Sequence, residues 1–353
     1  MSSTPFDYLV VGGGPGGVAA AHFLSEEGFK VVLAEQRPRL GSKPCGGGVP
    51  YHINMIMPLP SDSIKNTIKS MTLHFNMREA GSWYAGKTIF YMIDRSVYLE
   101  HFSTNFDVEL KTPVKINDKF ATFKNSKVEL SKVIIATGYS WRMKEREMLA
   151  QTIQYYFEGV KVDDPSNIDF YFFDDLVGYA WVFPYGDNEV KVGIGGLGVT
   201  VPELQARLDK LVEALNFDKS KITRIDGAPI DMGGIKLEWA TDPTYVVGEA
   251  LGAVMPLTGE GIRPSILTAK SLAYSISHNK DYKKVLKDLK IYKVGTQQVK
   301  ILKKVKKDKK LPKIDKLSPR AIETIYKFGL GEARLNDFLS SLPFSLSLLK
   351  SLL

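Results

Sequence analysis

Residues 7–35 read DYLVVGGGPGGVAAAHFLSEEGFKVVLAE, and this stretch decides the fold. The apolar run Tyr8–Val11 predicts a buried strand, and the glycines of residues 12–17 predict a tight turn. Small residues at 17–25 predict a helix packed closely on a sheet, and Lys30–Ala34 predicts a second, parallel strand. We therefore predict an α/β protein that opens with the βαβ unit of a Rossmann-type domain.

The glycine turn has the spacing Gly-x-Gly-x-x-Gly, and it stands between the predicted strand and the predicted helix. Gly12 permits the tight turn, Gly14 lets a pyrophosphate approach the backbone, and Gly17 lets the helix and strand pack closely. The N-terminus of the helix offers N–H groups and the positive end of its dipole. We expect Gly12, Gly14, Gly16 and Gly17 to contact a dinucleotide.

Glu35 ends the second strand, 18 residues after Gly17. A carboxylate at this position can accept hydrogen bonds from both ribose hydroxyls of an adenosine, and it repels a 2′-phosphate. The alternative, a glycine turn that holds no ligand, is disfavoured by the complete βαβ context.

A second segment indicates that the dinucleotide is FAD and not NAD. Residues 248–262 read GEALGAVMPLTGEGI and resemble flavoproteins of the glutathione-reductase type, in which a strand-end Gly-Asp precedes a proline and Gly-x-Gly-Ile. The resemblance implies FAD as the cofactor. It places Glu249, which replaces the usual aspartate, on the ribityl chain, and Gly259, Gly261 and Ile262 beside the flavin ring.

Three further segments resemble the geranylgeranyl reductase family. Residues 43–48 (KPCGGG) are similar to its Pro-x-x-Cys-Gly-Gly loop, and residues 178–184 (GYAWVFP) are similar to its Tyr-x-Trp-x-Phe-Pro strand. Asp94-Arg95 followed by Leu99 matches part of a third motif, although Val97 and Tyr98 replace its usual residues. Together the matches extend across roughly the first 280 residues.

This resemblance implies an enzyme that saturates carbon–carbon double bonds of isoprenoid chains on archaeal lipids, quinones or chlorophyll precursors. Cys45 would lie on the substrate side of the flavin, in a loop whose glycines permit close contact, and both Cys45 and Gly46 are expected to contact FAD. Cys45 would there orient the substrate or take part in proton delivery; the alternative is a packed thiol without chemistry. The remaining residues expected to bind FAD by this comparison are Arg95, Val114 and Gly138.

Aromatic strands suit an apolar, chain-shaped substrate. The runs Ile168–Phe173, Tyr179–Pro184 and Glu189–Gly195 predict an antiparallel sheet, and Tyr179, Trp181 and Phe183 share one face. Tyr179 and Trp181 join Cys45 as candidate catalytic residues. The alternative is an ordinary core sheet.

These assignments give a fold class and boundaries. We predict a Rossmann-type FAD-binding domain with an inserted antiparallel β-sheet substrate domain and a helical C-terminal region. The predicted boundaries are residues 1–58, 86–140 and 240–279 for the split FAD-binding domain, 59–85 and 141–239 for the substrate domain, and 280–353 for the C-terminal region.

The positive charge of the chain is concentrated in one segment. Residues 280–313 hold 14 lysines and three aspartates, whereas the rest of the chain is slightly acidic. Apolar residues among the lysines predict a helix that rests on anionic lipid; a solvated helix of a heat-adapted protein is an equal alternative. No stacking or base-reading pattern indicates nucleic acid. Leu335–Leu353 predicts a further amphipathic helix.

Composition sets the expected location. The single cysteine excludes an intrachain disulfide and a multi-cysteine metal site, so we expect a reducing cytosol and no metal. Neither a signal peptide nor a transmembrane anchor is visible, which predicts a cytoplasmic protein with peripheral membrane contact. No histidine falls in a motif.

Two alternative functions remain at this point. An aromatic hydroxylase of similar fold would be expected to carry Asp-Gly where residues 136–138 read Ala-Thr-Gly, and to lack the Cys-Gly-Gly loop. A flavin-retaining binding protein at membranes is the alternative from another class. Outside residues 12–17, no Gly-x-Gly-x-x-Gly unit opens a second predicted βαβ unit, so transient NAD(P)H or a ferredoxin-type protein would reduce the flavin.

Overall fold

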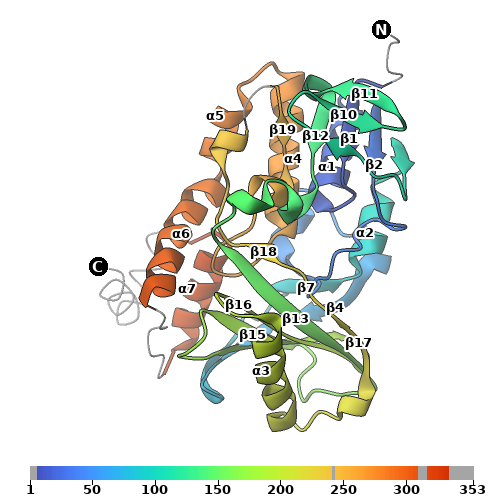
Figure 1. The fold of residues 1–353 in the computed structure, drawn as a ribbon. Coiled ribbons are helices and arrows are strands. Elements are labelled where there is room, and N and C mark those ends of the chain that lie inside the picture. Colours follow the sequence, from blue (N-terminus) through green and yellow to red (C-terminus); the bar gives the residue numbers. More distant parts are fainter. Residues whose placement is uncertain (1–5, 241–242, 309–315, 334–353) are drawn as a thin grey trace.

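The computed structural model describes residues 6–240, 243–308 and 316–333. Its first layer is a parallel five-stranded sheet with the order β19-β12-β1-β2-β8. The strands are β1 (Tyr8–Val11), β2 (Val31–Ala34), β8 (Asp107–Glu109), β12 (Val133–Ile135) and β19 (Tyr245–Val246). Helices α1 (Pro15–Glu26) and α4 (Ile262–Ser277) lie side by side against it (Figure 1).

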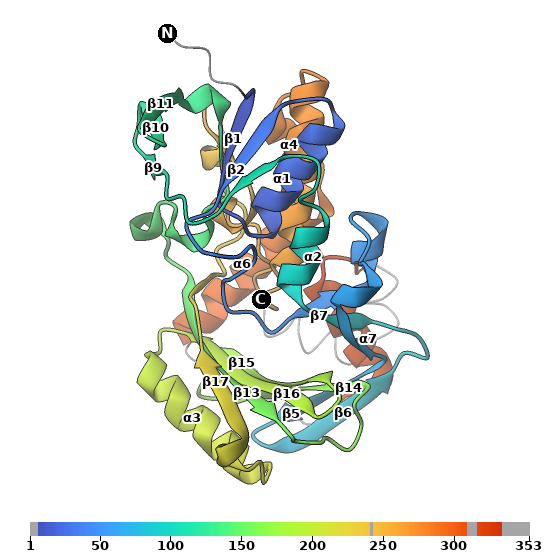
Figure 2. The same cartoon turned by 90° about the vertical axis from the view of Figure 1, so that its right-hand side faces the viewer.

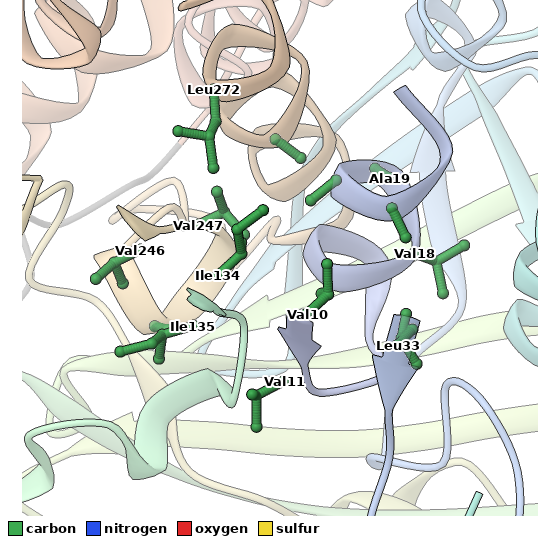
Figure 3. Close-up of a cluster of buried hydrophobic side chains, with 14 of the residues drawn as sticks. Val10, Val11, Val18, Ala19, Leu33, Ile134, Ile135, Val246, Val247 and Leu272 are labelled. Carbon is green, nitrogen blue, oxygen red and sulfur yellow. The ribbon is translucent and has the colours of Figure 1, made fainter. Parts of the chain in front are cut away.

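This sheet forms because its strands are apolar on both faces. Val10, Leu33 and Ile134 are fully buried, and Val18 of α1 and Leu272 of α4 meet them in one core (Figure 3). The helix α1 can approach so closely because Gly17 lacks a side chain: a Cβ there would lie 1.8 Å from the carbonyl oxygen of Gly12. The predicted βαβ opening is confirmed.

The second layer is an eight-stranded sheet with the order β17-β13-β16-β15-β14-β5-β6, and β18 also pairs with β13. Its strands are β5 (Ser70–Phe75), β6 (Arg78–Tyr84), β13 (Leu149–Glu158), β14 (Asn167–Phe172), β15 (Gly178–Gly186), β16 (Glu189–Leu197), β17 (Ile222–Asp226) and β18 (Ile230–Asp231). Pairing is antiparallel as predicted, except that β14 runs parallel to β5. The parallel pair is possible because the long connection of residues 76–166 lets the chain return to the same end of the sheet.

One face of this sheet is closed by helix α3 (Val201–Ala214), whose first turn is held by a capping box of Thr200 and Glu203. Leu204 and Leu208 of α3 are fully buried in one core cluster with residues of the sheet, and α3 packs on β16 and β13. Figure 2 shows α3 below the sheet, on the side away from the parallel layer. The opposite face of the sheet is therefore free to line a site.

The other strands of the described residues form two three-stranded sheets. One has the order β3-β7-β4 and the other β11-β10-β9. Their strands are β3 (Gly48–Pro50), β4 (Ile64–Ile68), β7 (Phe90–Ile93), β9 (Lys115–Ile116), β10 (Phe120–Phe123) and β11 (Ser126–Glu129). The alternating residues 107–116 would suit a single strand, but Lys111 takes a positive φ of 53°, and β8 and β9 enter different sheets.

The remaining helices are α2 (Arg95–His101), α5 (Tyr282–Asp288), α6 (Lys290–Asp308) and α7 (Pro319–Gly329). α7 packs on β6, and α5 packs on α4 and α6. The predicted fold class, including the helical C-terminal region, is confirmed, whereas the predicted domain boundaries stay a prediction. The helix expected at Leu335–Leu353 lies outside the described residues.

Candidate functional site

A cavity of about 1740 Å³ begins at the carboxyl ends of the parallel strands and extends to the free face of the large sheet. At one end it is lined by residues that follow β1, β2, β12 and β19, and at the other by aromatic side chains of β14 and β15. Pockets for drug-sized ligands have volumes of about 300–1,000 Å³. This cavity is large enough for a dinucleotide and a second ligand.

The glycines of the turn have different environments. A Cβ on Gly14 would meet no atom within 4 Å and would project into the cavity, whereas one on Gly16 would lie 3.0 Å from the Cα of Gly248. Gly12 and Gly17 are likewise required by close backbone packing. Gly14 is therefore the position of this turn that stays open for a ligand to approach.

Glu35 stands at the same end of the cavity. Its Oε2 accepts a hydrogen bond from the amide of Gly13 at 2.6 Å, and its Oε1 accepts one from the amide of Arg37 at 2.8 Å. Each carboxylate oxygen keeps a further lone pair. The backbone thus fixes a carboxylate beside the glycine turn, where it can still accept bonds from ribose hydroxyls.

Two helix N-termini point at this cavity without a side-chain cap. The N-cap residues Gly14 of α1 and Gly261 of α4 make no side-chain hydrogen bond, and both line the cavity. In contrast, α2, α3, α5 and α7 are capped by Asp94, Thr200, Asp281 and Ser318. Uncapped first-turn amides and the helix dipole favour an anionic ligand, so this end of the cavity fits the phosphates and the flavin ring of FAD.

Glu249 and Gly138 lie next to each other at this end of the cavity. Gly138 has φ +70°, and a Cβ there would lie 3.3 Å from the Oε2 of Glu249. The same oxygen pairs with the Nζ of Lys43 at 2.6 Å, and that Nζ lies 5.0 Å above the ring of Tyr139. Sequence reasoning missed Lys43, because 206 residues separate it from Glu249.

Arg95 lines the cavity, and its side chain donates hydrogen bonds to the backbone of residues 41–43. Its Nε donates to the carbonyl of Gly41 at 3.1 Å, and its Nη2 also donates to the carbonyl of Lys43. Arg95 therefore braces the loop that carries Cys45. Val114 lies between β8 and β9 and lines the cavity as well. Direct contact of either residue with FAD stays a prediction.

The free face of the large sheet forms an aromatic wall. The cavity is lined by Tyr179, Trp181 and Phe183, which share one face of β15 as their spacing predicted. The residues between them, Ala180 and Val182, are buried on the other face. The three aromatic ring centroids are 5.9 and 6.1 Å apart along the strand. Phe170 and Phe172 of β14 extend the wall.

Specific contacts fix these rings. The indole of Trp181 lies over Gly193, where a Cβ would stand 2.2 Å from the ring, and its Nε1 donates to the Oε1 of Gln154 at 3.1 Å. The hydroxyl of Tyr179 donates to the carbonyl of Thr258, and burial raises the pKa of Tyr179 above its usual range. Tyr179 thus keeps its proton and positions the loop next to Gly259.

Cys45 and Gly46 lie where the two ends of the cavity meet. Cys45 is partly buried and its Sγ accepts from the amide of Gly47 at 3.4 Å, while a Cβ on Gly46 would lie 3.0 Å from the ring of Phe183. Gln154 reaches the carbonyl of Cys45 at 3.5 Å and so joins this loop to Trp181. No sequence motif contains Gln154; only its inward place on β13 could have indicated it.

Comparisons with known proteins agree with this geometry. The pyridine nucleotide-disulphide oxidoreductase family model matches residues 6–156. The digeranylgeranylglycerophospholipid reductase of Thermoplasma acidophilum is 28% identical over 331 aligned positions, which cover 80% of this chain and 83% of the relative. The geranylgeranyl diphosphate reductase of Rhodobacter capsulatus is 29% identical, with coverage of 73% and 71%.

The chain is similar to the geranylgeranyl reductases. A solved structure supports the same fold: a geranylgeranyl bacteriochlorophyll reductase-like protein from Thermoplasma acidophilum has a TM-score of 0.78, with 23% identity and 99% coverage of both chains. The predicted resemblance to the geranylgeranyl reductase family is confirmed, and so is FAD as the cofactor.

Proposed function

We propose that this protein is an FAD-dependent reductase that saturates carbon–carbon double bonds of an isoprenoid chain on a membrane lipid. The observation that carries the proposal is one continuous cavity, with the glycine turn of an FAD site at one end, an aromatic wall at the other, and the Cys45 loop between them. The curated reductases named above support the same reaction class.

Bound FAD, once reduced, supplies the hydride for one alkene carbon, and a proton must reach the other. An isolated alkene accepts hydride poorly, so the proton has to be delivered early. Cys45 is our candidate donor because its thiol lines the cavity where the two ends meet. Trp181, held by Gln154, and Tyr179, held by Thr258, position the chain against this thiol.

The cavity also indicates an elongated apolar substrate. Beyond the aromatic wall it is lined by Ile301 and Val305 of α6 and by Ala321 and Ile325 of α7. Alkyl-lined space next to aromatic rings suits an isoprenoid chain. Lys304 and Lys316 also line the cavity near these helices and suit an anionic headgroup, which favours a lipid over a quinone.

Flavin reoxidation tests the function directly. The purified yellow protein is reduced anaerobically with dithionite and mixed with geranylgeranylated phospholipid or with a prenylated quinone, and flavin absorbance is followed. We expect the lipid to reoxidise the flavin and lose double bonds by mass spectrometry. In C45A we expect unchanged flavin content and reoxidation about 100-fold slower, the size typical of a lost general acid.

The same experiment separates the alternatives. Flavin that stays reduced with every prenyl compound contradicts the reductase and favours a flavin-retaining binding protein. Oxygen-dependent incorporation of a hydroxyl group into an aromatic compound would favour a hydroxylase, for which the chain lacks the expected Asp-Gly at 136–138. Parallel reduction trials with NAD(P)H and with a ferredoxin-type protein identify the physiological class of reductant.

Peripheral membrane contact through α6 is part of the proposal. In the part of the chain that the structure describes, no helix has the length and apolarity needed to cross a bilayer. The exposed lysines of α6 include Lys293, Lys300 and Lys307, and the same helix lines the cavity with Ile301 and Val305. A basic helix next to the cavity would let a lipid chain enter from an anionic surface.

We therefore expect the protein to sediment with vesicles that contain 30% phosphatidylglycerol and to be released by 0.5 M salt. Changing Lys293, Lys300 and Lys307 to glutamine should weaken binding by about 100-fold, since each basic residue near an anionic surface contributes about 1 kcal/mol. The same change at Lys115, Lys119 and Lys127, exposed on the β9–β11 sheet, is the matched control. Equal loss in both triple variants would contradict a specific role of α6.

A further inference from the structure

Lys191 is a buried lysine on the cavity face of the large sheet. In β16 it stands opposite Phe183 of β15 and Tyr156 of β13, and only 6% of its surface is exposed. Its Nζ lies 3.3 Å from the ring centroid of Tyr185 and 5.3 Å from that of Tyr156. Within the described residues no carboxylate pairs with it. Burying an unpaired ammonium costs free energy, so a lysine at this position indicates a functional role.

The Cys45 loop covers this lysine. Gly47 contacts both groups: its amide donates to the Sγ of Cys45 at 3.4 Å, and a Cβ in its place would lie 3.2 Å from the Nζ of Lys191. Gly47 has φ +87°, a conformation that favours glycine and lets the loop approach the lysine. The ammonium and the thiol are therefore neighbours, separated by one small residue.

Charges around Lys191 fit a role toward this thiol. Burial lowers the pKa of Lys191 to about 8, and the negative charge of an ionised Cys45 is the strongest influence in the opposite direction. Arg224 and Arg95 lower it further and Asp226 raises it, each more weakly than Cys45. The neighbouring hydroxyls stay protonated, since burial raises the pKa of Tyr156 to about 12 and that of Tyr185 further.

We propose that Lys191 is a positioning residue that stabilises the Cys45 thiolate and returns a proton to it after each reduction, an inference that rests on the proposed function. The alkene carbon takes the thiol proton and leaves a thiolate. The ammonium of Lys191 then gives one proton to sulfur, becomes a neutral amine, and regains a proton from water. Each turnover thus consumes one hydride from reduced FAD and one proton from solvent.

Thiol alkylation tests this role without relying on turnover. Cys45 is the single cysteine of the chain, so iodoacetamide uptake by the FAD-loaded protein reports on this thiol alone. At pH 7 we expect K191M to alkylate about tenfold more slowly than the unchanged protein, because a nearby cation favours the thiolate. The difference should disappear above pH 9, where Lys191 has lost its charge.

The pH dependence distinguishes electrostatics from access to the thiol. Equal rates at every pH, or slowing by one constant factor at every pH, would overturn the proposal. K236M changes another partly buried lysine of lowered pKa, whose Nζ donates to the carbonyls of Gly233 and Gly234, and it should alkylate at the normal rate. If K191M does not retain FAD, K191Q and K191R give the same comparison of neutral and charged side chains. A protein that fails to reduce prenyl chains can still pass this test, so the two proposals fail separately.

Discussion

Replacing Gly14 with alanine is expected to weaken FAD binding strongly while the fold stays intact. A Cβ at Gly14 meets no protein atom within 4 Å, so the methyl group costs the protein no packing. It projects into the cavity beside the uncapped N-terminus of α1, where the phosphates of FAD would approach the backbone. We expect FAD affinity to fall by about 100-fold, which corresponds to roughly 2.7 kcal/mol.

Two further variants make this expectation specific. G186A is the matched control, because Gly186 lies in the β15–β16 hairpin with no atom closer than 3.9 Å to a new Cβ; it should bind FAD normally. G17A should fail differently, by unfolding, since its Cβ would lie 1.8 Å from the Gly12 oxygen. Titration of the apoprotein with FAD and circular dichroism separate the cases. Normal FAD affinity in G14A would show that the cofactor does not approach this turn.

Some parts of the site were predictable from the sequence because local spacing determines them. The turn, Glu35 and the two strands were predictable because they lie within 29 consecutive residues with one local pattern. The alternation of Tyr179, Trp181 and Phe183 was predictable because strands place every second side chain on one face. In these segments local spacing alone determines the neighbours.

Contacts between distant segments were not predictable. Lys43 and Glu249 meet across 206 residues, and Gln154 joins the Cys45 loop to Trp181 across 109 and 27 residues. Lys191 resembles any surface lysine in the sequence and is buried only because β13, β15 and β16 pair in this register. Such neighbours follow from sheet order, and no short motif encodes sheet order.

Replacing Arg146 with an uncharged residue is expected to cause a large loss of stability. Its side chain and that of Asp231 are both fully buried and form an ion pair. Arg146 also donates to the carbonyl of Ala250 at 2.7 Å and to that of Trp141 at 3.0 Å. These bonds join the segment after β19, next to Glu249, to the start of the large sheet.

In R146M the carboxylate of Asp231 would remain buried without its cation, so we expect the free energy of unfolding to fall by about 3–5 kcal/mol, measured by urea denaturation of the apoprotein. The double variant R146M/D231L removes both charges and should recover much of this loss, because two apolar groups leave no unpaired charge. R142M is the control, since the pair of Arg142 with Glu145 is exposed and should contribute less than about 1 kcal/mol. If R146M were no less stable than R142M, the buried pair would not hold the two layers together, and the alignment of Glu249 with the aromatic wall would need another cause.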